Sequence, residues 1–433
     1  MIRSLTILIL FIVHTSFSQE NKFVIIGGKA HIGNGTVIEN ATIIINNGKI
    51  EEIGHKDSVN YQRENYEIID GMGKNIYPTF ILPNSSLGLV EIDAVRASRD
   101  EKEVGKFNPN VRSQIAYNAE SVVVSTVKNN GILMAQVTPR GSGLITGTSS
   151  IMKLDGHNWS DATYLKDDGI HINWPEIHHH QRWTHSHDFT ASDKDHDEED
   201  EKTKKNDQLI IELKSFFEDA KKYSADNSSY DLRLESMKGI FEGRQTLFIR
   251  ANSVNGIKSA ILFAENYNIK RYVIVGASDS WRITDFIKKY EVPIVLGRIH
   301  SLPRHIDDDI DQKFKTPKIL HDAGILFCLD YHGDMERMGS RNLPFLAGTS
   351  VSYGLSKENA LKLITSNPAK ILSIDDRTGT LEIGKDANLF ISTGDALDVM
   401  TNNVEFIFLE GKKVDLENHQ TRLYDKYLKS ITK

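Results

Sequence analysis

The chain lacks several features that would assign it to a class at once. It has a single cysteine among 433 residues, so an internal disulfide is excluded. Because Cys328 lies in the apolar stretch 325–329, it is predicted to be a small core side chain. Lysine and arginine (52) are fewer than aspartate and glutamate (59), which leaves a formal net charge of -7. Without a concentrated basic face, nucleic acid is not expected as a partner.

Long apolar runs are also missing, and the run near the start is too short to cross a membrane. Arg3 precedes this run, which covers residues 5–13, and small side chains follow at residues 16–18. This order is typical of a secretory signal peptide, so residues 1–18 are predicted to be removed by cleavage before Gln19. No cysteine stands at that junction, which excludes lipid attachment there. The chain is therefore predicted to be exported to the periplasm, with no stable membrane span after cleavage.

The composition that remains, 39% hydrophobic and 26% charged, is that of a globular protein with a large core. Short β-rich stretches occur near both ends of the chain and are separated by turns rich in glycine and asparagine, as hairpins require. These stretches are residues 23–26, 41–45, 49–53, 388–392 and 404–409. We expect one small β-sandwich formed by residues 19–76 and 377–433.

Strands alternate with helices from about residue 246 to residue 366. Four short apolar runs, each followed by residues at helical spacing or by a longer loop, carry this pattern. They are residues 247–250, 272–275, 293–296 and 325–329. Unbroken apolar strands in such units are typical of parallel strands that are buried on both faces. We expect an α/β fold in which residues 77–376 form a closed barrel.

An insert at about residues 159–223 interrupts this pattern. It contains a histidine cluster, an acidic run and then apolar residues at helical spacing from 209 to 220, which predict an amphipathic helix. The histidines are His178, His179, His180, His185, His187 and His196. They could collect Zn²⁺, Cu²⁺ or Ni²⁺. A solvated surface loop is the favoured interpretation, because their spacing does not point them to one centre. A metal held in such a loop would not orient a substrate.

Two sequence segments and the hairpins at the N-terminus together resemble the amidohydrolase superfamily, with imidazolonepropionase-like and dihydroorotase-like members the most similar. The first segment, residues 77–86, ends an apolar run; the second, residues 365–388, is the more specific for this superfamily. The resemblance covers nearly all of the chain after residue 18 except the insert. It implies a distorted (β/α)₈ TIM-like barrel with a β-sandwich formed from both chain ends.

In that family a metal is held at the C-terminal ends of the barrel strands, where it activates water and polarises the scissile carbonyl. The ligands are His-x-His on strand one, Lys or Glu on strand four, His on strands five and six, and Asp on strand eight. The positions in this chain that match strands one, five and eight are Asn84 and Ser86, then Arg250 or Asn252, then Asp330 with His332 two residues later. Strand six offers Gly276 or residues 277–279. Only one carboxylate, Asp330, matches the family's ligand pattern.

Arg250 argues most strongly against the family's metal. A guanidinium keeps its proton and has no lone pair to donate. At ~4 Å and an effective dielectric constant of about 20, its repulsion of a divalent cation would cost about 8 kcal/mol. We therefore expect the ordinary metal site to be absent and assign no cofactor. Zinc would be expected only if residues from elsewhere in the chain refill the site.

The candidate site residues follow from this resemblance. Asp330 is the candidate catalytic residue, either as a surviving general base or, by the favoured interpretation, as a carboxylate paired with Arg250. The candidate substrate-binding residues are Asn84, Ser86, Arg250, Asn252 and His332. The glycine-rich stretch 140–147, which begins at Arg140, resembles an anion cradle but lacks the full phosphate-loop pattern, so a structural loop near the barrel top is expected.

Two functions remain open at this point. In the first, which the family implies, the protein is a hydrolase of carbon–nitrogen bonds other than peptide bonds and acts on a small amide or cyclic amide. In the second, it is a non-catalytic protein with the amidohydrolase fold that binds a small ligand or partners an active homologue. Self-association into a homo-oligomer is compatible with either.

Overall fold

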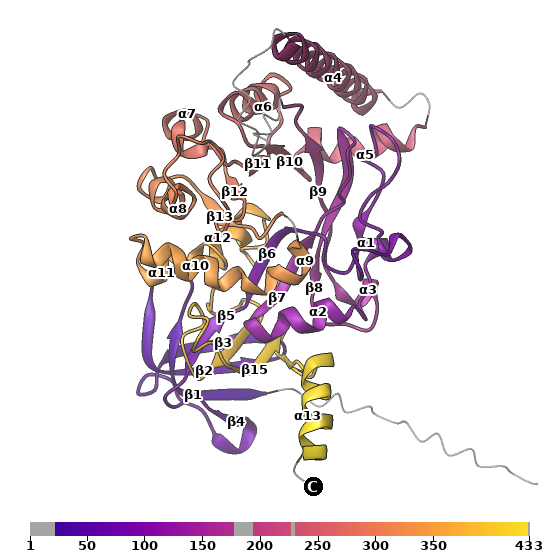
Figure 1. Cartoon of the computed structure of the whole chain (residues 1–433). Coiled ribbons are helices and arrows are strands. Elements are labelled where there is room, and N and C mark those ends of the chain that lie inside the picture. The colour runs from indigo at the N-terminus through magenta and orange to yellow at the C-terminus, as the bar shows by residue number, and fades with distance from the viewer. Residues whose placement is uncertain (1–21, 177–193, 227–229, 334, 432–433) are drawn as a thin grey trace, which may run out of the picture.

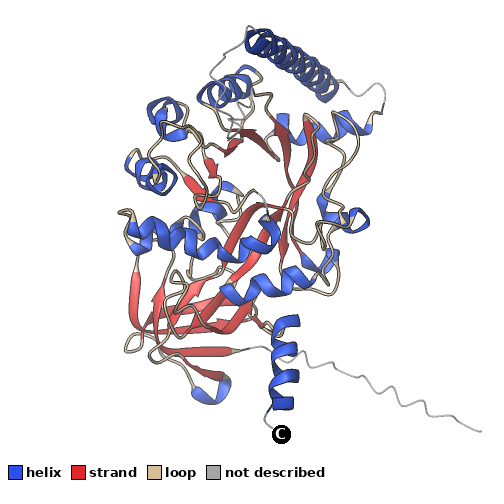
Figure 2. Cartoon of the chain, in the orientation of Figure 1, coloured by secondary structure: helices blue, strands red, loops and turns tan. Residues whose placement is uncertain are grey.

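The structure is a computed structural model that describes residues 22–176, 194–226, 230–333 and 335–431; side chains are described from residue 203 onward in the second segment. Two eight-stranded sheets organise the chain (Figures 1 and 2). One sheet is built from both chain ends, and the other is a nearly closed barrel with helices around it. The predicted fold class, a TIM-like barrel with a separate β domain from both ends, is confirmed.

The sheet from the chain ends has the strand order β16-β15-β14-β5-β1-β2-β3, with β4 beside β1. Its strands are β1 (Phe23–His31), β2 (Val37–Asn46), β3 (Lys49–His55), β4 (Glu67–Asp70), β5 (Asn75–Pro78), β14 (Leu389–Ser392), β15 (Val404–Leu409) and β16 (Lys412–Lys413). The two ends of the chain meet where β14 pairs antiparallel with β5. An apolar cluster on this sheet, which includes Ile43 and Phe408, forms the small core.

The barrel sheet runs in sequence order from β6 to β13. Its strands are β6 (Phe80–Ser85), β7 (Ile132–Val137), β8 (Ile145–Lys153), β9 (Thr163–Asn173), β10 (Thr246–Ala251), β11 (Tyr272–Gly276), β12 (Ile294–Leu296) and β13 (Phe327–Leu329). All neighbouring pairs are parallel except those of β8, which is antiparallel to both β7 and β9. The predicted parallel arrangement therefore holds from β9 to β13.

The gap between the first and last barrel strands is bridged by a short segment of chain. Leu329 on β13 donates its backbone N–H to the carbonyl of Leu363 at 3.1 Å. Ile81 on β6 donates in the same way to Ile364 at 2.9 Å. Because residues 363 and 364 satisfy both strand edges, the ends of β6 and β13 are held close together. This closure brings Asn84 and Asp330 into contact.

Most helices of the described chain lie around the barrel, whereas the C-terminal one lies near the sheet from the chain ends (Figures 1 and 2). The helices are α1 (Ser113–Ala116), α2 (Val122–Val127), α3 (Trp159–Ala162), α4 (Lys194–Ala225), α5 (Leu232–Glu242), α6 (Val254–Asn266), α7 (Thr284–Lys289), α8 (Gln312–Asp322), α9 (Glu336–Gly339), α10 (Leu343–Ser352), α11 (Lys357–Lys362), α12 (Ser366–Ile371) and α13 (His419–Ile431). Short 3₁₀ turns are η1 (Arg63–Asn65), η2 (Arg96–Ser98), η3 (Lys128–Asn130), η4 (Ser280–Arg282) and η5 (Ser340–Asn342).

The insert differs in part from its prediction. Residues 163–173 were placed in it but form the barrel strand β9, because their apolar side chains are buried in the barrel core. The predicted amphipathic helix exists as part of α4, which buries Leu213 and Phe217. The ring of Phe217 packs on Phe263 of α6 with centroids 4.8 Å apart. His178–His180, His185 and His187 lie outside the described residues.

Two further predictions concern the whole chain. Cys328 is a buried free thiol on β13, as expected of a small core side chain. Among the helices in the described part of the chain, none combines the length and apolar character needed to span a bilayer.

Candidate functional site

Asn84 is the central residue at the C-terminal end of the barrel. It ends β6 in a left-handed conformation with φ of 48°, which asparagine tolerates better than most residues. Its side-chain N–H donates to Asp330 Oδ2 at 2.6 Å, and its side-chain oxygen accepts from Arg250 at 3.2 Å. Its backbone N–H donates to Gln136 Oε1 at 3.1 Å. The two ends of one amide group therefore join the acid and the guanidinium.

Arg140 reaches the same place from the loop after β7. One of its N–H groups donates to the backbone carbonyl of Asn84 at 2.6 Å, and another contacts Nδ1 of His332. A guanidinium nitrogen also lies 3.7 Å from a carboxylate oxygen of Glu336. The glycine-rich stretch that starts at Arg140 is thus next to the strand ends, where the sequence predicted only a structural loop.

Glu336, the first residue of α9, holds the chain that follows β6. Its two carboxylate oxygens accept hydrogen bonds from the hydroxyls of Ser85 and Ser86, each at 2.6 Å. Arg337 donates to the Ser86 hydroxyl at 3.1 Å and forms an ion pair with Asp93. We call the whole set the barrel mouth. It comprises Asn84, Ser85, Ser86, Arg140, Arg250, Asp330, His332 and Glu336.

Burial sets the protonation of the barrel mouth. Burial raises the pKa of Asp330 to about 7, against the opposing effect of Arg140 and of the Asn84 hydrogen bond. Burial and the neighbouring Arg140 lower the pKa of Arg250 to about 9. The pKa of His332 lies well below its usual value because the ring is buried beside these arginines. His332 is therefore neutral near pH 7, while Arg250 carries charge at that pH.

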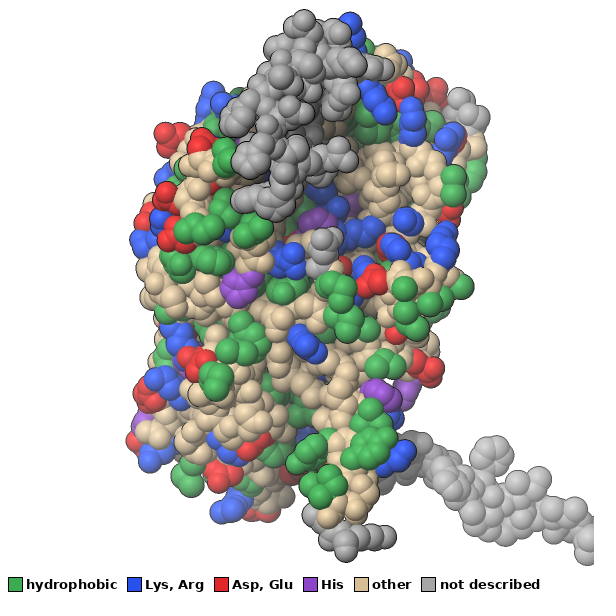
Figure 3. Space-filling model, in the orientation of Figure 1, with side chains coloured by type: hydrophobic (Ala, Val, Ile, Leu, Met, Phe, Trp, Pro, Cys, Tyr) green, Lys and Arg blue, Asp and Glu red, His purple; other side chains and the backbone are tan. Residues whose placement is uncertain are grey.

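Three buried polar atoms of the barrel mouth have no partner among the described residues. They are Oδ1 of Asp330, Nε of Arg140 and Nε of Arg250. An unpaired buried polar atom is costly, and such atoms are usually satisfied by a ligand or an ordered water. In the space-filling view, Lys and Arg side chains gather around a histidine near the middle of this face (Figure 3).

A polar network continues from the barrel mouth into the barrel interior. Gln136, which accepts from Asn84, donates through its amide to Asp168 Oδ2 at 2.6 Å. Ser149 bridges Asp168 and His171 at 2.8 Å to each. Burial raises the pKa of Asp168 to about 6 and lowers that of His171 well below its usual value. None of these four residues was predicted from the sequence, because nothing in its local spacing links them.

Two atoms of the barrel mouth that could bind a metal are directed at guanidinium groups. The side-chain oxygen of Asn84 faces the guanidinium of Arg250, and Nδ1 of His332 faces Arg140. These two atoms are thus directed at cations that would repel a metal ion. Within the part of the chain that the structure describes, no three His, Cys, Asp or Glu side chains group closely enough to hold an ion.

The structure brings together most of the predicted site residues. Asn84, Arg250 and Asp330 are linked directly, while Ser86 and His332 join through Glu336 and Arg140. The expected pairing of Asp330 with Arg250 runs through the Asn84 amide, so that expectation is corrected. The hydrogen bonds of Asn252 go to residues outside the barrel mouth: its backbone N–H donates to Glu176, and its side chain accepts from Ser278 at 3.0 Å. Arg140 and Glu336 were missed as site residues.

Comparisons with known proteins support the fold. Residues 298–414, which include Asp330, match the family model described as "Amidohydrolase family". No curated protein matches the chain by sequence. An amidohydrolase structure from Thermotoga maritima MSB8 is 20% identical with a TM-score of 0.76, and the alignment covers 91% of this chain and 100% of that one.

Two other solved structures share the fold at lower similarity. A molinate hydrolase is 15% identical with a TM-score of 0.54, covering 92% of this chain and 95% of that one. A β-aspartyl dipeptidase from Fervidobacterium islandicum AW-1 is 12% identical with a TM-score of 0.52, covering 90% and 96%. The family match toward the C-terminal end, together with a fold shared along nearly the whole chain, confirms the predicted resemblance to the amidohydrolase superfamily.

Proposed function

We propose that this protein uses the barrel mouth to bind a small molecule with a negatively charged group, in place of metal-dependent hydrolysis. One observation carries the proposal: the Asn84 amide joins Arg250 to Asp330 at the position where the family holds its metal. The match to the amidohydrolase family supports a hydrolase-like function at the coarser level. The donor set argues that the chemistry of this member differs from that of a metal enzyme.

The charge of the barrel mouth favours an anion. Arg140 and Arg250 each present a buried Nε without a partner, and both guanidiniums stay charged near pH 7. Asp330, with a pKa of about 7, is only partly ionised at that pH, so it offsets the arginines incompletely. A carboxylate or phosphate group can accept from two guanidinium N–H groups at once, which makes arginine well suited to such ligands.

Binding of N-acetylglycine, which combines a carboxylate with an amide, tests the proposal by titration calorimetry. Arg250→Gln should weaken binding by at least about tenfold, since it removes a charge-assisted hydrogen bond. Arg63→Gln, at an exposed position on η1 beside the sheet from the chain ends, is the matched control and should bind as the wild type does. Equal binding by both variants would show that the anion site lies elsewhere.

Metal content separates this proposal from ordinary hydrolysis. We expect less than one tightly held Zn²⁺ or Mn²⁺ per chain after dialysis against a chelator. The measurement should use a variant in which all six insert histidines are changed to Asn, so that they cannot supply the metal; these are His178, His179, His180, His185, His187 and His196. One retained metal ion per chain in that variant would contradict the proposal.

A second candidate function is hydrolysis of a carbon–nitrogen bond with Asp330 as the general base. The observation that favours it is the buried Oδ1 of Asp330, which has no partner and belongs to a carboxyl with a pKa of about 7. A pKa near the working pH suits a general base. In this reaction Asp330 would take a proton from a water molecule while the oxygen of that water attacks the carbonyl carbon. The carbon–nitrogen bond would then break, and the departing nitrogen would receive the proton from Asp330.

Turnover on a panel of N-acyl amino acids and cyclic amides tests the second candidate. If Asp330 is the base, kcat/KM should rise with pH to a plateau above about pH 7, because only the ionised carboxylate accepts a proton. Asp330→Asn should then remove turnover while N-acetylglycine still binds. Binding without turnover on any member of the panel would leave the first proposal standing alone.

We further propose that the mature protein is exported to the periplasm. The support is the charged start, the short apolar run and the small residues at 16–18. N-terminal sequencing of the protein from a periplasmic fraction should begin at Gln19. A chain that retains Met1 and stays with the cytoplasmic fraction would contradict this proposal.

A further inference from the structure

His31 ends β1 in the sheet from the chain ends, and its ring is buried. The side chain is 1% exposed. Its ring stacks on the ring of Tyr77 from β5, with centroids 4.5 Å apart and an interplanar angle of 7°. Burial raises the pKa of Tyr77 well above its usual value, so this neighbour stays neutral. The polar contacts of His31 are therefore made by its two ring nitrogens.

Both ring nitrogens of His31 face acceptor oxygens. Nε2 lies 3.3 Å from Oδ1 of Asn75. The other end of the Asn75 amide sets its orientation, because that N–H group donates to the carbonyl of Gly394 at 3.1 Å. Nδ1 lies 2.7 Å from a carboxylate oxygen of Glu358 on α11. The contact with Asn75 therefore needs a proton on Nε2, and a second proton must lie between Nδ1 and Glu358.

The His31–Glu358 pair thus holds one proton more than a neutral ring beside an ionised carboxylate. Without this shared proton, two acceptor atoms would face each other at hydrogen-bond distance, which is unfavourable in a buried site. The other carboxylate oxygen of Glu358, Oε2, is also buried and has no partner among the described residues. No protein group seen there compensates for loss of the first contact. The contact therefore depends on the shared proton.

Helix α11 connects this pair to the closure of the barrel. Residues 363 and 364 follow the helix directly and accept the backbone N–H groups of Leu329 on β13 and Ile81 on β6. A second ion pair joins α11 to the sheet from the chain ends, between Lys357 and Asp395 at 2.9 Å. Its side chains are 33% and 37% exposed, so water weakens it. The buried pair is the stronger of the two links.

We propose that the His31–Glu358 pair is a pH-sensitive latch on the barrel. With its shared proton, the pair holds α11 and the closing segment, residues 363 and 364, against the sheet from the chain ends. When the proton leaves, the contact is lost and the closing segment loosens. Because β6 and β13 hold Asn84 and Asp330 at their C-terminal ends, release of this segment also loosens the barrel mouth.

The direction of the pH effect follows from the unfolded chain. There, separate histidine and glutamate side chains release the extra proton above about pH 6.5. The contribution of the latch to stability is therefore full below that pH. It is lost at higher pH, as the folded protein releases the proton too. We expect a closed latch at about pH 6 and an open one at about pH 9.

Chemical denaturation of the wild type and of Glu358→Gln at these two pH values tests the latch. A glutamine can donate an N–H to a neutral His31 ring, so this variant keeps the contact without the titrating proton. Between the two pH values, the equilibrium constant for unfolding should rise at least about tenfold more in the wild type than in the variant. His55→Gln is the matched control, because His55 pairs with Asp57 at an exposed position. It should follow the wild type within about twofold.

Hydrogen exchange of backbone amides in the folded protein locates the effect. At the higher pH, protection of Ile81 and Leu329, which donate to the closing segment, should be about tenfold lower in the wild type than in Glu358→Gln. Ile274, whose N–H donates to Pro293 at 3.1 Å, is the control amide and should be equally protected in both proteins. His31→Gln, which cannot hold the proton, should show the lower protection already at about pH 6.

Two results would overturn the proposal. One is the same pH dependence of unfolding in the wild type and in Glu358→Gln, because the pair would then hold no titrating proton. The other is an equal loss of protection at Ile81, Leu329 and Ile274. The pair would then stabilise the whole fold without releasing the closing segment.

Discussion

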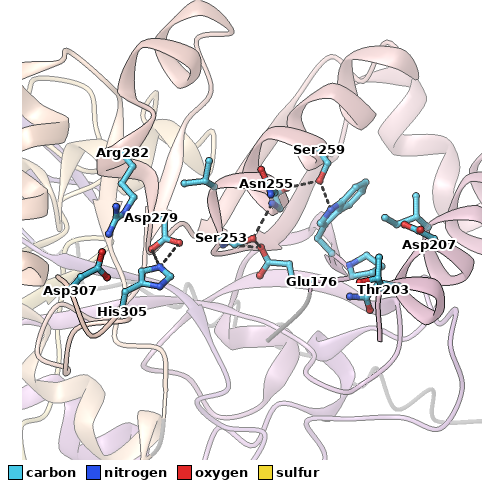
Figure 4. A pocket seen from close by; sticks show the side chains of 16 residues that line it. Glu176, Thr203, Asp207, Ser253, Asn255, Ser259, Asp279, Arg282, His305 and Asp307 are labelled. Atoms are coloured by element: carbon cyan, nitrogen blue, oxygen red, sulfur yellow. Dashed lines mark hydrogen bonds and ion pairs between the residues drawn. The ribbon is translucent and has the colours of Figure 1, made fainter. Parts of the chain in front are cut away.

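The barrel mouth and a second cavity lie at the same end of the barrel, yet their charges are arranged in opposite ways. We call the second the α4 cavity, because it lies between α4 and the C-terminal ends of β9, β10 and β11 (Figure 4). In the barrel mouth the acid and the guanidiniums are buried and joined through one amide, Asn84. In the α4 cavity the carboxylates of Asp207 and Asp307 are exposed, and neither has an ion pair among the described residues. Burial makes each charge of the first site depend on its neighbours, whereas the charges of the second site are screened by water and act almost independently.

The difference shows what one scaffold can hold. Strand ends that converge on the barrel axis place side chains in a dry centre, where an unsatisfied charge is expensive and every partner matters. Loops that leave the same strands outward, towards α4, place side chains where solvent lowers that cost. Substitutions should therefore have large effects on stability in the barrel mouth and small effects in the cavity.

The largest expected effect is that of Glu336→Ala. The change leaves the buried hydroxyls of Ser85 and Ser86 without their acceptor and removes a negative charge near Arg140. We expect the free energy of unfolding to fall by about 4 kcal/mol, as when one partner of a buried charge pair is removed. Chemical denaturation measures it. Glu51→Ala, at an exposed position on β3, should change the free energy of unfolding by less than about 0.5 kcal/mol. Similar losses in the two variants would show that the buried carboxylate matters no more to stability than an exposed one.

The next effect is on the pH dependence of stability, through Asp330→Asn. Folding raises the pKa of Asp330 from its ordinary value to about 7, so the folded protein binds an extra proton between about pH 4 and about pH 7. The stability that this proton contributes is fully present below about pH 4 and is lost as the pH rises through about 7. The stability of the wild type relative to the variant should therefore fall by about 3 kcal/mol across this range.

Denaturation of both proteins at several pH values gives this difference. Comparison of the two removes the contributions of His171, His332 and Asp168, which the proteins share. A difference that does not change with pH would mean that Asp330 has an ordinary carboxyl pKa. The claim that burial controls the charge of the barrel mouth would then be wrong.

The smallest expected effect is at the α4 cavity, in Gly256→Ala. The Glu176 carboxylate lines this cavity and accepts the backbone N–H groups of Asn252 and Ser253 at the N-terminus of α6. A Cβ at Gly256 would overlap a carboxylate oxygen of Glu176, so Glu176 should leave the N-terminus of α6. We expect a loss of about 1 kcal/mol in unfolding free energy, since overpacking and the lost N–H contacts are offset by the better helix propensity of alanine.

A double-variant cycle separates the overlap from other causes. With Glu176→Ala already present, the added Gly256→Ala meets no carboxylate and should be neutral or slightly stabilising. An equal loss in both backgrounds would show that the Cβ clashes with something other than Glu176.

The sequence predicted four of the eight barrel strands, β10 to β13, because local periodicity defines them. Residues 272–275 became β11, and residues 247–250 lie within β10, each ending at the expected barrel end. Asn84 and Asp330 were placed at the strand ends through the resemblance to a known family. The start of the insert was wrong, because the apolar residues of β9 follow turn-like residues and no clear strand pattern marks them.

The sequence could not predict the partners of Asn84 and Ser85. Asp330 is 246 positions from Asn84, and Glu336 is 251 positions from Ser85. Glu336 also lies on a four-residue helix that has no family signature. The sequence marks Arg140 only as the start of a glycine-rich loop, and the closure of the barrel places its guanidinium on the Asn84 carbonyl.

The sequence by itself determined the strands β10 to β13 and the amphipathic part of α4, because neighbouring residues set the periodicity that defines them. Only the tertiary structure decided that the amide of Asn84 lies between an acid and a guanidinium and that two exposed carboxylates face one cavity. Those contacts depend on barrel closure, which brings distant segments of the chain together. Closure is driven by the burial of apolar surface, and that burial does not specify which polar residues meet.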